Sequence, residues 1–210
     1  MKKVINFVFA ACLSLSMFAG SPEFHDAMLS NIKSLDTTKK FDDYIALAGT
    51  FEQISTVDKT EWLPQYYAAF CYIQASFNVT DEDKKDVMAD KALEITDNAL
   101  KLRPTESELY TLVGFANLAK LSAKPMLRNM TYVGKIKDFL EKACQLNPNN
   151  PRPVFLLGTL TYNSPEFIGG GKEKALPQLK DALEKFNTFT PSSNLSPSWG
   201  KGACEYYINK

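Results

Sequence analysis

Small residues recur along this chain with a period of about 45 residues. Each lies inside a similar local pattern, and the spacings between Ala69, Gly114, Gly158 and Ala203 are 45, 44 and 45 residues. A small residue at a fixed period indicates a place where two helices approach closely, because a larger side chain would hold them apart. A repeat of this length predicts stacked helical hairpins, an α-solenoid, rather than one layered core.

Each repeat divides into two helical halves. The first half contains the small residue, as in Tyr110-x-x-Val113-Gly114-x-x-Asn117 and Trp199-x-x-Gly202-Ala203-x-x-Tyr206. The second half has the pattern Ala92, Ala99, Pro104, which returns as Ile136, Ala143, Pro148. Offsets of three, four and seven place these residues on one face of a helix. The prolines are expected to end the second helix, because proline cannot continue one.

These motifs resemble the tetratricopeptide repeat (TPR) family, whose pattern is W-x2-L-G-x2-Y, then A-x3-F, then P. The resemblance covers about residues 40–208, with Trp199, Ala203 and Tyr206 as the best match to the first helix. Each unit is roughly ten residues longer than the family repeat of about 34. We expect the added length between the two helices of a unit, at about 78–88, 120–132 and 163–172. The period alone would also suit HEAT or armadillo repeats.

The predicted fold is all-α: an α-solenoid of stacked antiparallel, TPR-like hairpins, with about four units and a C-terminal capping helix. One helical repeat domain is expected over residues 21–210. The predicted helices cover 24–35, 39–57, 61–77, 82–102, 107–122, 132–146, 151–163, 172–186 and 197–208.

The N-terminus has the layout of a secretory signal peptide over residues 1–20. Lys2 and Lys3 precede an apolar run, and small residues follow it at 19–21. We therefore expect an exported protein, periplasmic or secreted, with no integral membrane segment in the mature chain. A lipid anchor at Cys12 is less favoured, because the apolar run continues beyond that cysteine.

Composition argues against several chemistries. The formal charge is zero, with 24 basic and 24 acidic residues spread along the chain, so nothing indicates a nucleic-acid partner. His25 is the single histidine, which leaves no base for a catalytic thiol and no zinc-ligand spacing. Beyond the leader, Cys71, Cys144 and Cys204 are expected to be buried thiols. The sequence predicts no catalytic residue, no metal and no cofactor, and the chain is not expected to be an enzyme.

The resemblance implies a concave groove lined by the first helix of each unit. The candidate partner-binding residues are Tyr66, Phe70, Glu108, Phe115, Arg152, Phe155, Tyr162 and Tyr207. An aromatic groove suits an apolar or helical peptide segment. Two alternatives stay open: the groove is exposed, or these aromatics form a core that the insertions cover.

The predicted function is that of an exported scaffold or adaptor for protein–protein interactions in the bacterial cell envelope, with a protein or peptide partner. The alternative is a periplasmic ligand-binding accessory of a solute transporter, which would hold a small apolar ligand. This alternative requires an enclosed pocket lined by Tyr66, Phe115, Phe155 and Tyr162.

Overall fold

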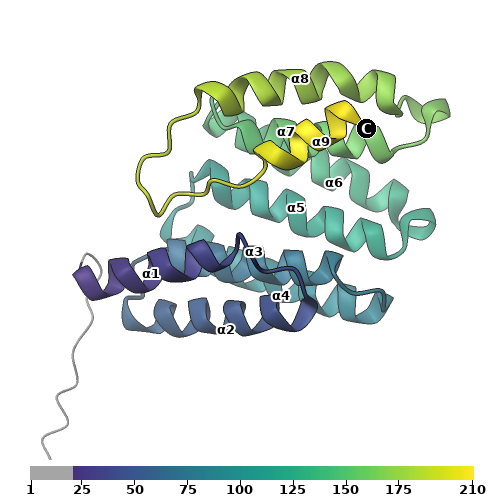
Figure 1. The fold of residues 1–210 in the computed structure, drawn as a ribbon. Coiled ribbons are helices and arrows are strands. Elements are labelled where there is room, and N and C mark those ends of the chain that lie inside the picture. The colour runs from purple at the N-terminus through teal and green to yellow at the C-terminus, as the bar shows by residue number, and fades with distance from the viewer. Residues whose placement is uncertain (1–20) are drawn as a thin grey trace, which may run out of the picture.

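The computed structural model describes residues 21–210, and within them every regular element is a helix, as predicted (Figure 1). The predicted signal peptide, with Cys12, lies outside the described residues. In residues 21–210, no helix combines the length and the apolar character needed to cross a membrane.

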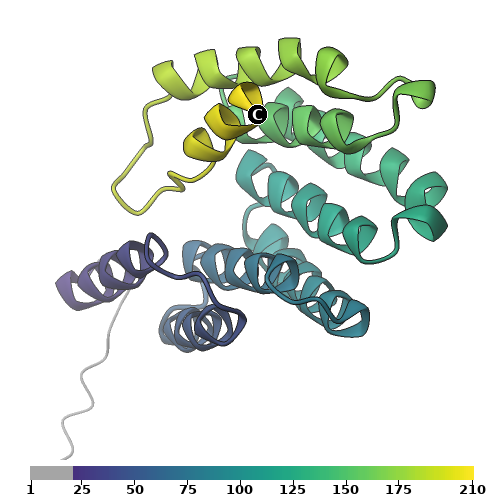
Figure 2. The same cartoon turned by 45° about the vertical axis from the view of Figure 1, so that its right-hand side comes forward.

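The helices follow one another as antiparallel hairpins. Each hairpin packs on the next in chain order, from α1 and α2 at one end of the stack to α7 and α8 at the other (Figures 1 and 2). The bounds are α1 Pro22–Ser34, α2 Phe41–Val57, α3 Leu63–Phe77, α4 Glu82–Leu102, α5 Ser107–Ala123, α6 Pro125–Leu146, α7 Pro151–Asn163, the short 3₁₀ helix η1 Glu166–Ile168, α8 Lys172–Thr188 and α9 Lys201–Asn209.

Local sequence signals set the helix ends. Asp81 caps α4 by accepting a hydrogen bond from the Lys84 backbone N–H, and Asn150 caps α7 in the same way. The prediction that α6 begins near residue 132 was wrong. Pro125 occupies the first turn of α6, where a missing N–H costs nothing, and only Lys124 separates α5 from α6. The added length of this repeat therefore extends its helices instead of forming an inserted loop.

The recurring small residues mark close helix contacts at two of the predicted sites. A methyl group added at Gly114 would lie 2.5 Å from Leu140 Cδ2, and one at Gly158 would lie 2.8 Å from Leu179 Cδ2. Ala203 is different, because it is exposed on α9. The neighbouring Cys204 is buried there, with its thiol 3.2 Å from the Leu179 carbonyl. The prediction of close packing at Ala203 was one residue out of register.

The buried side chains form two hydrophobic clusters that meet in the middle of the stack. One fills the hairpins from α1 to α5, and the other fills α6 to α9. Phe115 of α5 and Trp199, just before α9, pack against both clusters. The C-terminal segment therefore bridges the two clusters as well as capping the last hairpin.

Candidate functional site

A cavity of about 1080 Å³ opens between the first helices of successive hairpins and the start of α9. Side chains of α3, α5 and α7 supply most of its walls, and the turn between α7 and α8 supplies part of its rim. The aromatic residues that line it are Phe70, Phe77, Phe115, Phe155, Phe167, Trp199 and Tyr207. The cavity is therefore a mainly apolar site with large flat side chains.

Four of these rings pack together in one wall as an aromatic cluster. Trp199 stacks on Phe70 with ring centroids 5.1 Å apart, and on Phe115 at 5.4 Å with an interplanar angle of 20°. Phe70 and Phe115 lie 6.4 Å apart and are tilted by 46°, and Phe77 stacks on Phe115 at 5.4 Å. Aromatic rings are therefore the main apolar surface of this wall.

The far wall is built around Tyr207 of α9. Its ring makes edge contacts with Phe155, at a centroid distance of 6.2 Å, and with Tyr162, at 5.1 Å. At the mouth of the cavity, Met126 and Phe167 are 96% and 89% exposed. The cavity therefore reaches solvent between α6 and the turn that follows α7.

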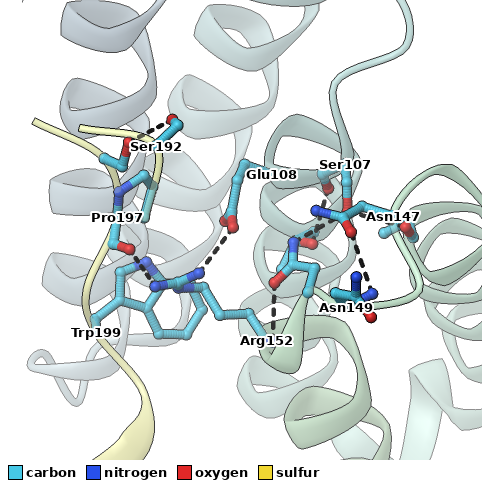
Figure 3. A network of polar contacts seen from close by, with 12 residues as sticks. Ser107, Glu108, Asn147, Asn149, Arg152, Ser192, Pro197 and Trp199 are labelled. Atoms are coloured by element: carbon cyan, nitrogen blue, oxygen red, sulfur yellow. Dashed lines mark hydrogen bonds and ion pairs between the residues drawn. The ribbon is translucent and has the colours of Figure 1, made fainter. Parts of the chain in front are cut away.

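A buried polar cluster adjoins the aromatic cluster at Trp199. Arg152 Nη1 donates to Glu108 Oε1 at 2.8 Å, and Arg152 Nη2 donates to the carbonyl of Pro197 (Figure 3). The indole N–H of Trp199 donates to the Tyr66 hydroxyl at 2.8 Å, and this hydroxyl lies 3.3 Å from Glu108. The wall residue Trp199 is therefore tied directly to the buried cluster.

Burial dominates the electrostatics of this cluster. It raises the pKa of Glu108 above its ordinary value, although the nearby Arg152 charge opposes the shift. It also raises the pKa of Tyr66 well above its ordinary value. The guanidinium of Arg152 lies between two rings, 5.5 Å from the centroid of Trp199 and 5.3 Å from that of Phe189.

The structure divides the predicted groove residues between two places. Phe70, Phe115, Phe155 and Tyr207 line the cavity, and Tyr162 supports Tyr207 from behind. Tyr66, Glu108 and Arg152 are buried in the polar cluster and do not line the cavity. Their role in partner binding stays a prediction, and any such role would act through the wall that they support.

Sequence reasoning assigned Trp199 only to the repeat motif and missed its place in the cavity wall. It also missed Phe77, Met126 and Phe167. Trp199 and Gly200 of the C-terminal stretch line the groove, and so do residues of the predicted insertions at 120–132 and 163–172, among them Met126 and Phe167. The available sequence signal was the position of Met126 and Phe167, two large apolar residues beside prolines and glycines that indicate turns.

The three cysteine thiols neither line the cavity nor belong to the buried polar cluster. Burial raises the pKa of Cys71, of Cys144 and of Cys204, the last to about 11. These thiols therefore stay protonated near neutral pH. Within residues 21–210, no three His, Cys, Asp or Glu side chains gather where they could hold a metal ion.

Comparison with known proteins gives a family and a structural relative. Residues 28–166, more than half of the chain, match the RMD1-3 family, described as Regulator of microtubule dynamics protein 1-3. The chain belongs to this family. The RMD1-3 match ends before the C-terminal segment that carries Trp199. A search of curated proteins found no match.

Among solved structures, the fold is similar to the HusA haemophore from Porphyromonas gingivalis. The TM-score is 0.80 at 29% sequence identity, over 91% of this chain and 94% of that one. Neither RMD1-3 nor this haemophore is a TPR family, so the predicted TPR assignment was wrong. The helical solenoid-like fold class was confirmed.

Proposed function

We propose that this protein binds a flat, largely apolar ligand of the porphyrin class in the cavity between α3, α5, α7 and α9. The aromatic cluster of Phe70, Phe77, Phe115 and Trp199 in the wall of a cavity of about 1080 Å³ carries the proposal. This volume is slightly larger than the roughly 300–1,000 Å³ of most small-molecule sites. The similarity to a protein named a haemophore supports the ligand class.

The polar groups of the lining are few and uncharged, which suits a ligand that is mostly a conjugated ring with a few polar substituents. They are the amides of Gln74, Asn129 and Asn163 and the hydroxyls of Ser122, Thr159 and Ser164, together with the Tyr207 hydroxyl. We further infer a binding role without catalysis. The lining residues include no carboxylate, imidazole or thiol, and the protonated thiols elsewhere are poor nucleophiles.

Titration with haemin tests this function, with absorbance and quenching of tryptophan fluorescence as readouts. We expect saturable one-to-one binding, and we expect Phe115→Leu to weaken it about tenfold by removing one stacking face. Phe24→Leu is the matched control, because Phe24 is buried in α1 and does not line the cavity. Absence of saturable binding, or equal affinity of the two variants, would refute the proposal.

Export is part of the proposal. The charged and apolar leader at residues 1–20 supports it, as does the similarity to a protein named a haemophore. Mass spectrometry of the protein isolated from its source should give an N-terminus near residues 19–21. An intact Met1 on the accumulated protein would contradict export by this leader.

A protein partner at the cavity mouth is a second candidate function. Three apolar side chains in the first two turns of α6 favour it, because Met126, Leu127 and Met130 are 96%, 82% and 99% exposed. Exposed apolar side chains grouped in this way are typical of an interaction site. A pull-down with the wild type and with all three changed to serine tests the adaptor role. It requires one salt-resistant partner that the serine variant loses.

A further inference from the structure

Residues 189–200 connect α8 to α9 without regular secondary structure and carry Trp199 into the cavity wall. Part of this stretch is held by its own hydrogen bonds. The Ser196 hydroxyl lies 3.0 Å from that of Ser192 and 3.1 Å from that of Ser193, and it accepts from the Ser193 backbone N–H at 3.1 Å. These hydrogen bonds hold residues 192–196 as one compact turn.

Side chains of the helical stack tie this unit down. The Tyr67 hydroxyl donates to the Leu195 carbonyl at 2.7 Å. Arg152 donates to the Pro197 carbonyl, and Tyr66 accepts from the indole of Trp199. All three of these side chains come from first helices of the stack, Tyr66 and Tyr67 from α3 and Arg152 from α7. His25 of α1 adds a fourth contact, with its Nε2 3.0 Å from Asn194 Oδ1, and Leu195 and Trp199 pack against the first hydrophobic cluster. The position of the segment therefore depends on these four polar contacts and on two apolar side chains.

Arg152 contacts both ends of the segment. Its guanidinium lies over the ring of Phe189, where the segment begins, and over the ring of Trp199, where it ends (Figure 3 shows the Trp199 end). A planar guanidinium can stack and donate hydrogen bonds at once, which an ammonium cannot. One side chain thus gathers the two ends of an eleven-residue stretch, from 189 to 199.

Holding the segment in this position costs desolvation free energy, because the Arg152–Glu108 ion pair is buried. Arg152 and Glu108 are both buried, and Arg152 Nε has no hydrogen-bond partner among the described residues. A buried ion pair repays its desolvation only when its polar atoms are satisfied. A separate surface pocket of about 480 Å³ lies beside the start of the segment, lined by Phe189 and Thr190 together with Asn147, Asn149, Lys185 and Thr188.

We propose that residues 189–200 form a hinged wall of the cavity, which opens to exchange ligand and which Arg152 positions against the bound ligand. The proposal rests on the proposed function, because the ligand is the one held in the aromatic cavity. Gly200 is the hinge at the α9 end. Its φ of 112° is a conformation that favours glycine, and an added methyl there would meet the Phe186 ring at 2.6 Å.

Hydrogen exchange of the protein without ligand tests the wall directly. Tyr67→Phe removes one hydroxyl tie and should raise exchange across residues 189–200 about three- to tenfold, with the amides of α3 and α5 unchanged. Tyr44→Phe is the matched control. It also loses a buried hydroxyl that donates to a backbone carbonyl, that of Thr38 at 2.9 Å, but this contact lies in the first hairpin. Equal exchange of the segment in the two variants would overturn the hinged wall.

Ligand kinetics test the positioning role of Arg152, with haemin as the probe. Arg152→Lys keeps the charge but loses the planar stack, so haemin should dissociate about tenfold faster, with a smaller change in affinity because association also quickens. Haemin should also slow exchange across residues 189–200 in the wild type. An unchanged dissociation rate in a folded Arg152→Lys variant would overturn the role of Arg152. If haemin does not bind at all, the proposed function fails while the exchange comparison still decides whether the wall moves.

Discussion

Substitution of Gly114 by alanine tests the close approach on which the stack depends. The new methyl would lie 2.5 Å from Leu140 Cδ2 and 2.7 Å from Leu140 Cγ, and Leu140 is fully buried. Overpacking of this kind costs about 1–3 kcal/mol. Alanine also gains about 1 kcal/mol over glycine in a helix, so the net effect of a single substitution is hard to interpret alone.

Gly134→Ala removes this ambiguity. Gly134 lies inside α6 with no atom within 4 Å of the added methyl, so it receives the helical gain without the clash. Urea denaturation should therefore place Gly114→Ala about 1–3 kcal/mol below Gly134→Ala in the free energy of unfolding. In the double variant with Leu140→Ala, the total loss should be smaller than the sum of the two single losses, because the added methyl occupies space that Leu140 vacates. Equal stabilities of the two alanine variants, within about 0.5 kcal/mol, would refute close packing at Gly114.

Three further substitutions test the electrostatics and the caps. Hydrogen bonds from Arg128 hold the pKa of Asp86 below its ordinary value of 3.8. Ionised Asp86 therefore stabilises the protein above pH 3.8, and this stabilisation is lost as the pH falls through the lowered pKa. Acid titration should show a smaller fall of the unfolding free energy in Asp86→Asn than in the wild type. Burial raises the pKa of Glu108 above its ordinary value of 4.5, so its contribution to stability is fully present below pH 4.5 and is lost as the pH rises through the raised pKa. Glu108→Gln should remove this loss, and the same pH dependence of the unfolding free energy in both proteins above pH 4.5 would contradict it. Asn150→Ala removes the N-cap of α7 and should cost about 1–2 kcal/mol in urea denaturation, whereas a wild-type value would mean that the cap adds nothing.

Repeat spacing predicted most of the fold because it reports directly on helix packing. The helix ends at Pro104 and Pro148 followed from proline chemistry, and α4 and α7 have the predicted bounds. The prediction of the start of α6 did not use Pro125, which lies in the first turn of this helix, where proline is favoured. Proline is thus found both after helix ends and in first turns, and its presence alone does not distinguish the two.

The candidate site was predictable only in part. The resemblance to TPR repeats, wrong as a family assignment, implied a groove that includes Phe115 and Phe155, and both line the cavity. The stretch 189–200 has no periodicity to interpret, because its Ser, Pro and Asn residues fit many turns. Its course is set by tertiary contacts from Tyr67 and Arg152, which lie far away in the sequence. The position of Trp199 in the cavity wall therefore could not be predicted.

The repeat itself nevertheless explains why a cavity wall forms there. Tyr66, Glu108 and Arg152 come from the first helices of three successive hairpins and lie 42 and 44 residues apart, close to one repeat. Stacking brings such equivalent positions together, so a hydroxyl, a carboxylate and a guanidinium meet in a line across the helices. Opposite charges one period apart were a sequence signal for this line. Because the line ends at Pro197 and Trp199, the register that stacks the hairpins also fixes the segment that closes the cavity.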